Sequence, residues 1–412
     1  MTIESTRRTL LGAAAASPLL ALPLSARAQA ANTIRIGVLT DLSGTFRDLN
    51  GPNTVAATRL AAQEFAGRGF NVEVVVADHQ NRPDVGVNIA RQWFDRENVD
   101  VVTSLAASSV ALAVADVARE RNKVAIATST ATSDLTGRAC NANTIHWVYD
   151  TYMLAKTSGA ATVRAGGDTW FFMTADYAFG HALERDTSAF VRAAGGRVIG
   201  SVRTPFPGTT DFSSFLLQAQ ASRAKVIGLA NAGVDTINSI KQAAEFGITR
   251  RGIKIASLLL FITDVHALGL EVAQGLVCAN TFYWDANDRT RGLTRRIRAI
   301  VGGDIPVAMS HAGDYAGTLH YLKAVADMGV AAAKASGRAA VERMKAMPTQ
   351  DDAFGAGSIR ADGRKLHPAY LYEVKAPSES RYQHDYYKPL QTSTAEEAFR
   401  PLAEGGCPMI RT

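Results

Sequence analysis

The chain has 412 residues, of which 47% are hydrophobic and 20% are charged, a balance typical of a folded protein rather than a disordered one. This length is enough for two domains of ordinary size. The formal net charge of +6 comes from Lys and Arg that are spread along the chain without a cluster on one helix, so we expect no nucleic-acid partner.

The first 28 residues have the features of an export signal. Arg7 and Arg8 precede a mildly apolar stretch that ends in small residues, a pattern that favours the twin-arginine route. The alternative is a membrane anchor, but Pro18 and Pro23 interrupt an apolar run that is shorter than the ~20 residues a bilayer requires. With cleavage after Ala28, we expect a soluble periplasmic protein.

Strands and helices then alternate. A buried strand every ~25–35 residues, with a helix in each interval, is typical of a parallel, doubly wound sheet. Strands are predicted at 33–40, 72–78, 99–105 and 123–128, and helices at 55–65, 85–94 and 110–121.

The same pattern starts again at residue 169. Strands are predicted at 169–174, 196–202, 225–230 and 252–257, and helices at 181–194, 211–221 and 234–246. From about Leu276 onward, strands and helices no longer alternate regularly. The elements predicted there are a strand at 275–285, helices at 293–301 and 312–330, and a hairpin at 357–375. We expect these pieces to complete two Rossmann-like α/β lobes. Lobe one would hold residues 32–149 and 281–366, and lobe two would hold residues 150–280 together with the tail, 367–412.

The three cysteines differ in their surroundings. Cys278 lies in an apolar, strand-like run and is expected to be a buried thiol. Cys140 and Cys407 lie in polar, loop-like stretches. In an oxidising compartment we expect these two to form a disulfide, although the sequence does not fix the connectivity.

Hydroxyl side chains follow two neighbouring strands of the first predicted sheet. Ser108 and Ser109 follow the third strand, and Ser129, Thr130 and Thr132 follow the fourth. Ligands of open parallel sheets bind beyond the carboxyl ends of the strands, where helix N-termini expose free N–H groups. These loops could therefore hold a carboxylate. The alternative is that the hydroxyls only cap the helices.

Aromatic side chains are also found at the predicted strand ends of both lobes. They could line a cleft and stack on a flat ligand, or they could pack in the core or the hinge. They are Phe46, Trp147, Tyr149, Tyr152, Tyr177 and Phe179.

Catalytic motifs are missing from the sequence. There is no G-x-G-x-x-G after the first strand, no Walker lysine and no G-x-S-x-G. The eight histidines show no metal-ligand spacing. Asp264 and His266 lie close together but lack a third partner, and Asp264 is better explained as a helix-start residue. We expect a binding protein with no cofactor and no metal, rather than an enzyme.

From about Thr33 to the C-terminus, the chain resembles the type I periplasmic solute-binding proteins of ABC importers, the branched-chain amino-acid (Leu/Ile/Val) receptor family. The resemblance implies two lobes joined by a hinge of three strands, which close on a solute and dock to a membrane permease. We expect a monomer. The matching stretches, in order, are IGVLTDLSG, SLAASSVALAV, ATSTATSDLTG, DYAFGHALERD, DFSSFLLQAQASRAKVIGLANAG and IKQAAEFGI.

The resemblance also implies the roles of individual residues. The ligand carboxylate would be held by the strand-end hydroxyls, and the second lobe would supply aromatic and amide contacts. The hydroxyls are those of Ser108, Ser109, Ser129 and Thr130; the other contacts are Tyr149, Tyr152, Phe179 and Asn231, with Phe46 as a further aromatic contact from lobe one.

One position departs from the family pattern. Amino-acid receptors of this family pair the ligand ammonium with an acidic residue in the loop where this chain has Leu258. A buried ammonium without a counterion costs several kcal/mol. We therefore favour an aromatic or oxo acid as the ligand. A branched-chain amino acid remains the alternative if Asp48 or Asp150 reaches the ligand, as does a sensory role for the same fold; an exported oxidoreductase is disfavoured by the missing glycine motif.

Overall fold

The computed structural model describes residues 32–410. The predicted export signal, its twin arginines and its cleavage position at Ala28 lie outside these residues. Within residues 32–410, no helix has both the length and the apolar character needed to cross a bilayer.

Lobe one is built on a five-stranded sheet in the order β2-β1-β3-β4-β5, in which every neighbouring pair is parallel. The doubly wound arrangement is thus confirmed, with one strand, β5, that the sequence pattern did not reveal. The helices α3 and α4 each begin with proline, whose fixed φ suits the first helical turn. The elements are β1 (Thr33–Thr40), α2 (Arg47–Asn50), α3 (Pro52–Glu64), β2 (Asn71–Asp78), α4 (Pro83–Asp95), β3 (Val101–Ser104), α5 (Ser108–Glu120), β4 (Val124–Ala127) and β5 (Thr144–His146).

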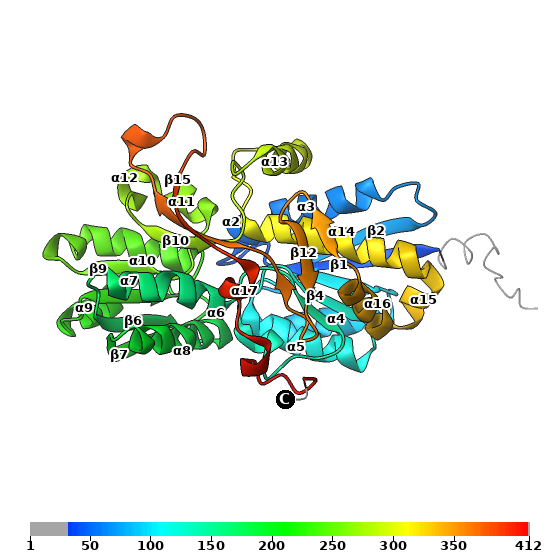
Figure 1. Cartoon of the computed structure of the whole chain (residues 1–412), viewed down its shortest axis with the longest axis horizontal. Coiled ribbons are helices and arrows are strands. Elements are labelled where there is room, and N and C mark those ends of the chain that lie inside the picture. Colours follow the sequence, from blue (N-terminus) through cyan, green and yellow to red (C-terminus); the bar gives the residue numbers. More distant parts are fainter. Residues whose placement is uncertain (1–31, 411–412) are drawn as a thin grey trace, which may run out of the picture.

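Lobe two repeats the design with a four-stranded parallel sheet in the order β7-β6-β8-β9. The elements are α6 (Thr151–Leu154), a π-helical turn (Ala155–Gly159), α7 (Ala160–Arg164), β6 (Thr169–Ala175), α8 (Ala178–Ala193), β7 (Arg197–Thr204), α9 (Ser213–Ala221), β8 (Val226–Ala230), α10 (Val234–Glu245), β9 (Lys254–Ser257), α11 (Ile262–Leu268) and α12 (Leu270–Ala273). In Figure 1 this lobe, coloured green, lies beside lobe one, which is mainly blue and cyan.

The last third of the chain returns to both lobes. Helices α13 and α14 pack on α3 of lobe one, whereas β10, β14 and β15 form an antiparallel sheet near β9 of lobe two. The elements are β10 (Val277–Asn280), α13 (Asp288–Val301), α14 (Met309–Met328), α15 (Val330–Ala335), α16 (Gly337–Ala346), β11 (Thr349–Asp351), β12 (Gly355–Ile359), β13 (Lys365–Leu366), β14 (Ala369–Val374), β15 (Tyr387–Ser393) and α17 (Ala395–Ala398). Single 3₁₀ turns occur at Ser133–Thr136, Thr249–Arg251, Pro377–Glu379 and Leu402–Glu404.

The chain passes between the lobes after β5, after β10 and after β13, and the tail returns to lobe one after β15. Arg364, which is fully buried and precedes the third passage, connects the first passage with the tail. Its guanidinium donates to the carbonyl of Val148, lies 3.3 Å from the Asp150 carboxylate and stacks 4.5 Å from the ring of Phe399 in the tail.

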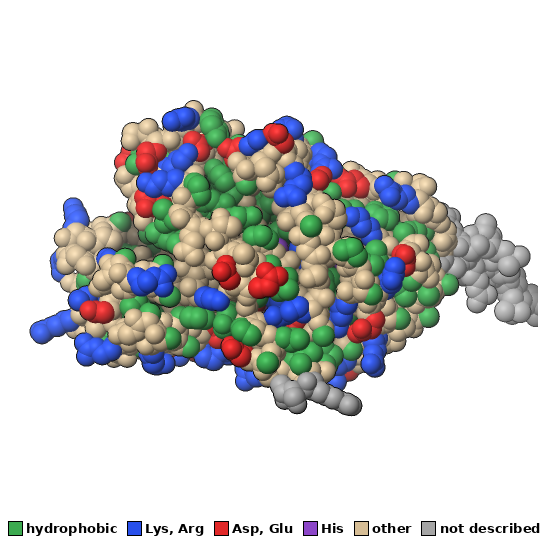
Figure 2. Space-filling model, viewed as in Figure 1, with side chains coloured by type: hydrophobic (Ala, Val, Ile, Leu, Met, Phe, Trp, Pro, Cys, Tyr) green, Lys and Arg blue, Asp and Glu red, His purple; other side chains and the backbone are tan. Residues whose placement is uncertain are grey.

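The end of the tail, which was expected in lobe two, is covalently attached to lobe one. Cys407 forms a disulfide with Cys140, the pairing expected from the sequence, with 5.5 Å between the two Cα atoms. Cys278 is a buried free thiol, as predicted. On the face of the molecule in Figure 2, charged side chains of both signs are intermixed rather than gathered by sign.

Candidate ligand-binding site

The carboxyl ends of the two parallel sheets face each other, and a small cavity lies between them. Its lining comes from the loops that follow β1, β3 and β4 in lobe one and β6, β8 and β9 in lobe two, together with the first passage between the lobes. This is the position where ligands bind in open α/β sheets. The lining residues are Phe46, Leu49, Ala106, Ser108, Ser129, Ala131, Tyr149, Tyr177, Phe179, Ala232, Leu259 and Phe261.

The cavity is almost closed. Its volume is about 20 Å³, which suffices for about one water molecule, whereas ligand pockets usually measure ~300–1,000 Å³. The lobes touch directly beside it, where the Val234 N–H donates to the Thr45 carbonyl at 3.2 Å. A solute of any size can therefore enter only if the lobes separate. A larger, mainly apolar groove of about 670 Å³ lies within lobe two, lined by residues of α7, β9 and β10.

Ser108 supplies a free hydroxyl to the cavity. It is the first residue of α5, and the residue before it, Ala107, occupies the N-cap position without a polar side chain. The first N–H groups of α5 therefore lack both an intrahelical acceptor and a side-chain cap. The Ser108 Oγ accepts a hydrogen bond from the Thr132 N–H at 3.3 Å, so its own proton can point elsewhere. Ser108 and Ser109 are thus first-turn residues rather than helix caps.

Ser129 is connected to a buried carboxyl group. Its Oγ lies 3.3 Å from the Asp314 carboxylate of α14, which also accepts hydrogen bonds from Thr103, at 3.4 Å, and Thr128. Burial raises the pKa of Asp314 to about 7, even though these hydroxyls favour the ionised form. While Asp314 is protonated, the Ser129 hydroxyl can donate to a ligand instead. Sequence reasoning missed Asp314.

Aromatic rings of both lobes meet at the cavity. Phe46 of lobe one stacks on Phe206 of lobe two with 5.5 Å between ring centroids, and Tyr177 stacks on the same ring at 3.9 Å. Tyr149 packs edge-on against Phe261 at 5.5 Å. The site therefore has flat apolar walls on both sides.

Five of the ten predicted ligand residues line the cavity, and five do not. The lining five are Phe46, Ser108, Ser129, Tyr149 and Phe179. The five outside the lining are Ser109, Thr130, Tyr152, Asn231 and Leu258.

Three of the outlying five already have partners within their own lobe. The Thr130 hydroxyl donates to a backbone carbonyl of the neighbouring loop. Asn231 bonds through its side-chain amide to two hydroxyls of α10, at 2.8 and 3.0 Å. Tyr152 packs edge-on against a phenylalanine of α8, 5.0 Å away. Leu258 is buried, and the next residue, Leu259, takes its place in the lining.

The sequence left open whether Asp48 or Asp150 could pair with a ligand ammonium, and in the structure both carboxylates have other partners. Asp150 caps α6 and pairs with Arg364, while Asp48 is exposed and pairs with Arg47 at 3.0 Å. Neither belongs to the lining, and none of the twelve described lining residues is charged. Asp235 in the first turn of α10 is buried, and its Oδ2 has no hydrogen-bond partner in the described chain. Burial raises the pKa of Asp235 to about 7.

Comparison with known proteins gives one family and a consistent set of solved structures. The model of a family described as periplasmic binding proteins matches residues 33–380. A periplasmic binding protein from Burkholderia mallei is 44% identical, with 92% of this chain and 100% of that chain covered and a TM-score of 0.88. No curated protein matches the chain.

Two further solved structures are similar. A branched-chain amino-acid ABC transporter periplasmic ligand-binding protein from Burkholderia xenovorans is 37% identical, covering 91% of this chain and 99% of that chain, with a TM-score of 0.78. A solute-binding protein of an ABC transporter from R. palustris, in complex with benzoate, is 18% identical, covering 88% and 97%, with a TM-score of 0.77.

Proposed function

Because this chain belongs to the periplasmic binding proteins, the solute-binding components of ABC transporters, we propose that it captures a small organic acid between its lobes, with an aromatic or oxo acid favoured. The observation that carries this proposal is the pair of hydroxyl side chains that Ser108 and Ser129 contribute to the lining, beside the uncapped start of α5. A carboxylate accepts hydrogen bonds from hydroxyl and backbone donors together, without a cationic partner.

The walls of the cavity support an aromatic or otherwise flat ligand. The rings of Phe46, Tyr177 and Phe261 come from opposite lobes and could enclose a planar molecule once the lobes open and close around it. Solute-binding proteins of the same fold from R. palustris were solved with benzoate and with 4-hydroxybenzoate. This ligand class is consistent with an uncharged lining, which offers an ammonium group no partner.

A branched-chain amino acid is the second candidate, and one observation favours it. Asp235 is buried with an Oδ2 atom that has no hydrogen-bond partner in the described chain, so an ammonium group that reached α10 would find a carboxylate there. The relative from Burkholderia xenovorans is also described as a branched-chain amino-acid protein.

A thermal-shift screen of the exported form separates the two candidates. The panel contains benzoates, phenylpropenoid acids, oxo acids, leucine and valine. A ligand present at 100 times its Kd stabilises the folded state by about 2.7 kcal/mol, which is a measurable rise in Tm. We expect the organic acids to raise the Tm. A rise with leucine or valine alone would overturn the proposed ligand class.

Two adjacent serines provide a matched pair of variants. Ser108→Ala removes a hydroxyl from the cavity and should weaken binding of the acid by about 1–3 kcal/mol, measured by calorimetry. Ser109→Ala changes the next residue of the same helix turn, outside the lining, and should leave the affinity unchanged. Equal affinities of the two variants would remove the proposed carboxylate site. Asp235→Asn should abolish binding only if the ligand carries an ammonium group.

We further propose that capture is followed by transport rather than by chemistry or signalling. Closure of the lobes on the solute would produce the form that an inner-membrane permease selects. The proposed place of action is the periplasm, after removal of the export signal near Ala28. Genes for a permease and an ATPase beside the gene of this chain would support transport over a sensory role.

A further inference from the structure

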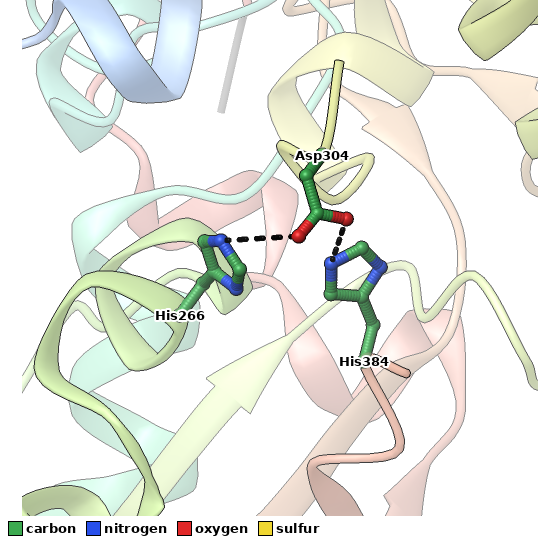
Figure 3. Close-up of side chains that lie close together, drawn as sticks. All are labelled: His266, Asp304 and His384. Atoms are coloured by element: carbon green, nitrogen blue, oxygen red, sulfur yellow. Dashed lines mark ion pairs between the residues drawn. The ribbon is translucent and has the colours of Figure 1, made fainter. Parts of the chain in front are cut away.

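Three potential metal ligands meet where the lobes touch, outside the cavity. They are His266, Asp304 and His384, and their ligand atoms lie within 4.8 Å of one another (Figure 3). The Asp304 carboxylate lies between the rings, 3.3 Å from the His384 Nε2 and 4.0 Å from the His266 Nε2.

The three side chains come from different lobes. His266 belongs to α11, and His384 lies in the loop before β15, both in lobe two. Asp304 lies between α13 and α14, which pack on lobe one. Because these residues are separated by 38 and 80 positions, no local motif in the sequence indicates the cluster. It exists only while the lobes are together.

The ring of His266 and the backbone of His384 are both held in place. The Nδ1 of His266 lies 2.8 Å from the hydroxyl of Tyr386, which leaves the Nε2 directed at Asp304. Metal-binding histidines usually have such a partner on their second ring nitrogen. The backbone carbonyl of His384 accepts a hydrogen bond from the Trp284 indole at 2.9 Å, which fixes the loop that carries the ring.

The Nε2 of His384 has no hydrogen bond in the described chain, although its side chain is only 3% exposed. Its polar neighbour is the Asp304 Oδ1 at 3.3 Å, in a geometry that makes no hydrogen bond, and a buried polar atom in this situation calls for an explanation such as an ion or a ligand.

Asp304 provides access to the cluster from solvent. Its side chain is 56% exposed, and its Oδ1 also has Arg298 at 3.5 Å and the Gln383 amide as neighbours. Its Oδ2 faces His266. The carboxylate thus retains an oxygen that can coordinate an ion while these neighbours hold its orientation.

We propose that His266, Asp304 and His384 form a binding site for a divalent ion of the zinc class, and that this ion joins the two lobes. Two imidazoles and a carboxylate are ligands that Zn²⁺ accepts, with one position left for water. Ligand bonds of ~2.0–2.2 Å place neighbouring ligand atoms of a tetrahedron about 3.3 Å apart. The contact between the Asp304 Oδ1 and the His384 Nε2, at 3.3 Å, already has this length. The three ligand atoms lie within 4.8 Å of one another, so the longest separation would need to shorten by up to about 1.5 Å.

An ion held by both lobes would stabilise the closed form. If closure captures a solute, as proposed above, the ion and the solute bind to the same form, and each would increase the affinity for the other by the same factor. This consequence depends on the proposed function, whereas the metal site itself does not.

The first experiment measures Zn²⁺ affinity of the full chain without an affinity tag, by competition with a chromogenic chelator and without any organic acid. We expect one Zn²⁺ per chain, with Co²⁺ giving the intense visible bands of four-coordinate cobalt. His384→Ala and Asp304→Asn should each weaken binding by at least about 10-fold, and Tyr386→Phe by about 10–100-fold.

The control variant is His181→Ala, because His181 forms an exposed pair with Asp176, at 2.8 Å, in lobe two. This variant should bind Zn²⁺ as the unaltered chain does. Asp304 is exposed, so Asp304→Asn should fold, which its circular dichroism in EDTA would verify. Equal Zn²⁺ affinity of the unaltered chain and Asp304→Asn would overturn the site.

Small-angle X-ray scattering tests the connection between the lobes. Zn²⁺ should reduce the radius of gyration of the unaltered chain and leave that of Asp304→Asn unchanged. Zinc binding without this difference would overturn the bridging role, and neither result depends on the identity of the captured solute.

Discussion

Asp314→Asn is the most informative single substitution, because the carboxyl group of Asp314 is fully buried beneath the ligand cavity. Burial raises its pKa from 3.8 to about 7. Between about pH 4 and pH 7 the folded chain therefore binds a proton that the unfolded chain releases. The contribution of Asp314 to the free energy of unfolding therefore falls as the pH rises through this window and is constant above it.

The size of the effect follows from the pKa difference. Each pKa unit corresponds to 1.36 kcal/mol, so a shift of about three units corresponds to about 4 kcal/mol. An asparagine cannot ionise, so its contribution to stability does not change with pH. The free energy of unfolding of the variant, relative to that of the unaltered chain, should therefore increase by about this amount between pH 4 and pH 8. With an unfolding entropy of ~2.1 cal/mol/K per residue, a chain of this length has about 0.8 kcal/mol/K, and the gain corresponds to about 5 °C in Tm.

Scanning calorimetry of both proteins at several pH values from 4.5 to 8 measures this gain directly. The difference in Tm between Asp314→Asn and the unaltered chain should grow by about 5 °C across the series. The control is Asp116→Asn, which changes an exposed aspartate of α5 and should give a constant difference. Parallel Tm profiles for Asp314→Asn and the unaltered chain would refute the argument that burial controls the protonation of Asp314.

Three further predictions concern the disulfide, Arg364 and the pH dependence of ligand binding. Reduction of the Cys140–Cys407 disulfide should lower the stability by about 2–5 kcal/mol in a urea titration, and a double Cys→Ser variant should no longer respond to the reductant. Arg364→Met should cost about 3–5 kcal/mol in the same titration, because it leaves the buried Asp150 carboxylate without its partner. An acid ligand should bind more weakly as the pH rises through about 7, since an ionised Asp314 repels it; calorimetry of Asp314→Asn should show a flatter pH dependence.

Most of the fold could be predicted because strands such as β1, β4, β6 and β8 contain runs of apolar residues, and the intervals between the strands show helical spacing. The strand β5 was missed because it has only three residues, Thr144–His146, too few to show a periodic pattern. The predicted helix boundaries differ from the observed ones by a few residues. The start of α5 matters most, because it places Ser108 and Ser109 inside the first turn rather than before it.

The candidate site could be predicted to the level of the loop, but not of the side chain. The position of a residue after a parallel strand fixes the edge of the sheet where it lies, which is why Ser108 and Ser129 were found. Its direction depends on the local backbone, and neighbouring helical residues differ by about 100°. This explains how Ser108 lines the cavity while Ser109 does not. Leu258 and Leu259 lie in the loop after β9, where no regular spacing indicates which of the two side chains faces the cavity.

Groups that act across long sequence separations were not predictable. Asp314 reaches Ser129 from a helix 185 positions later in the chain, and no pattern near either residue indicates the contact. The same holds for the pairing of His266 and His384 with Asp304.

Arg364 gives the junction between the lobes a mechanical property. It contacts the first passage at Val148 and the returning tail at Phe399, next to the third passage, which begins just beyond β13. When several interdomain segments are held side by side, they permit rotation of the lobes about one axis and resist twisting about the others. We expect the two lobes to open and close by rotation about a single axis, so that the same residues of the two lobes face each other after every cycle.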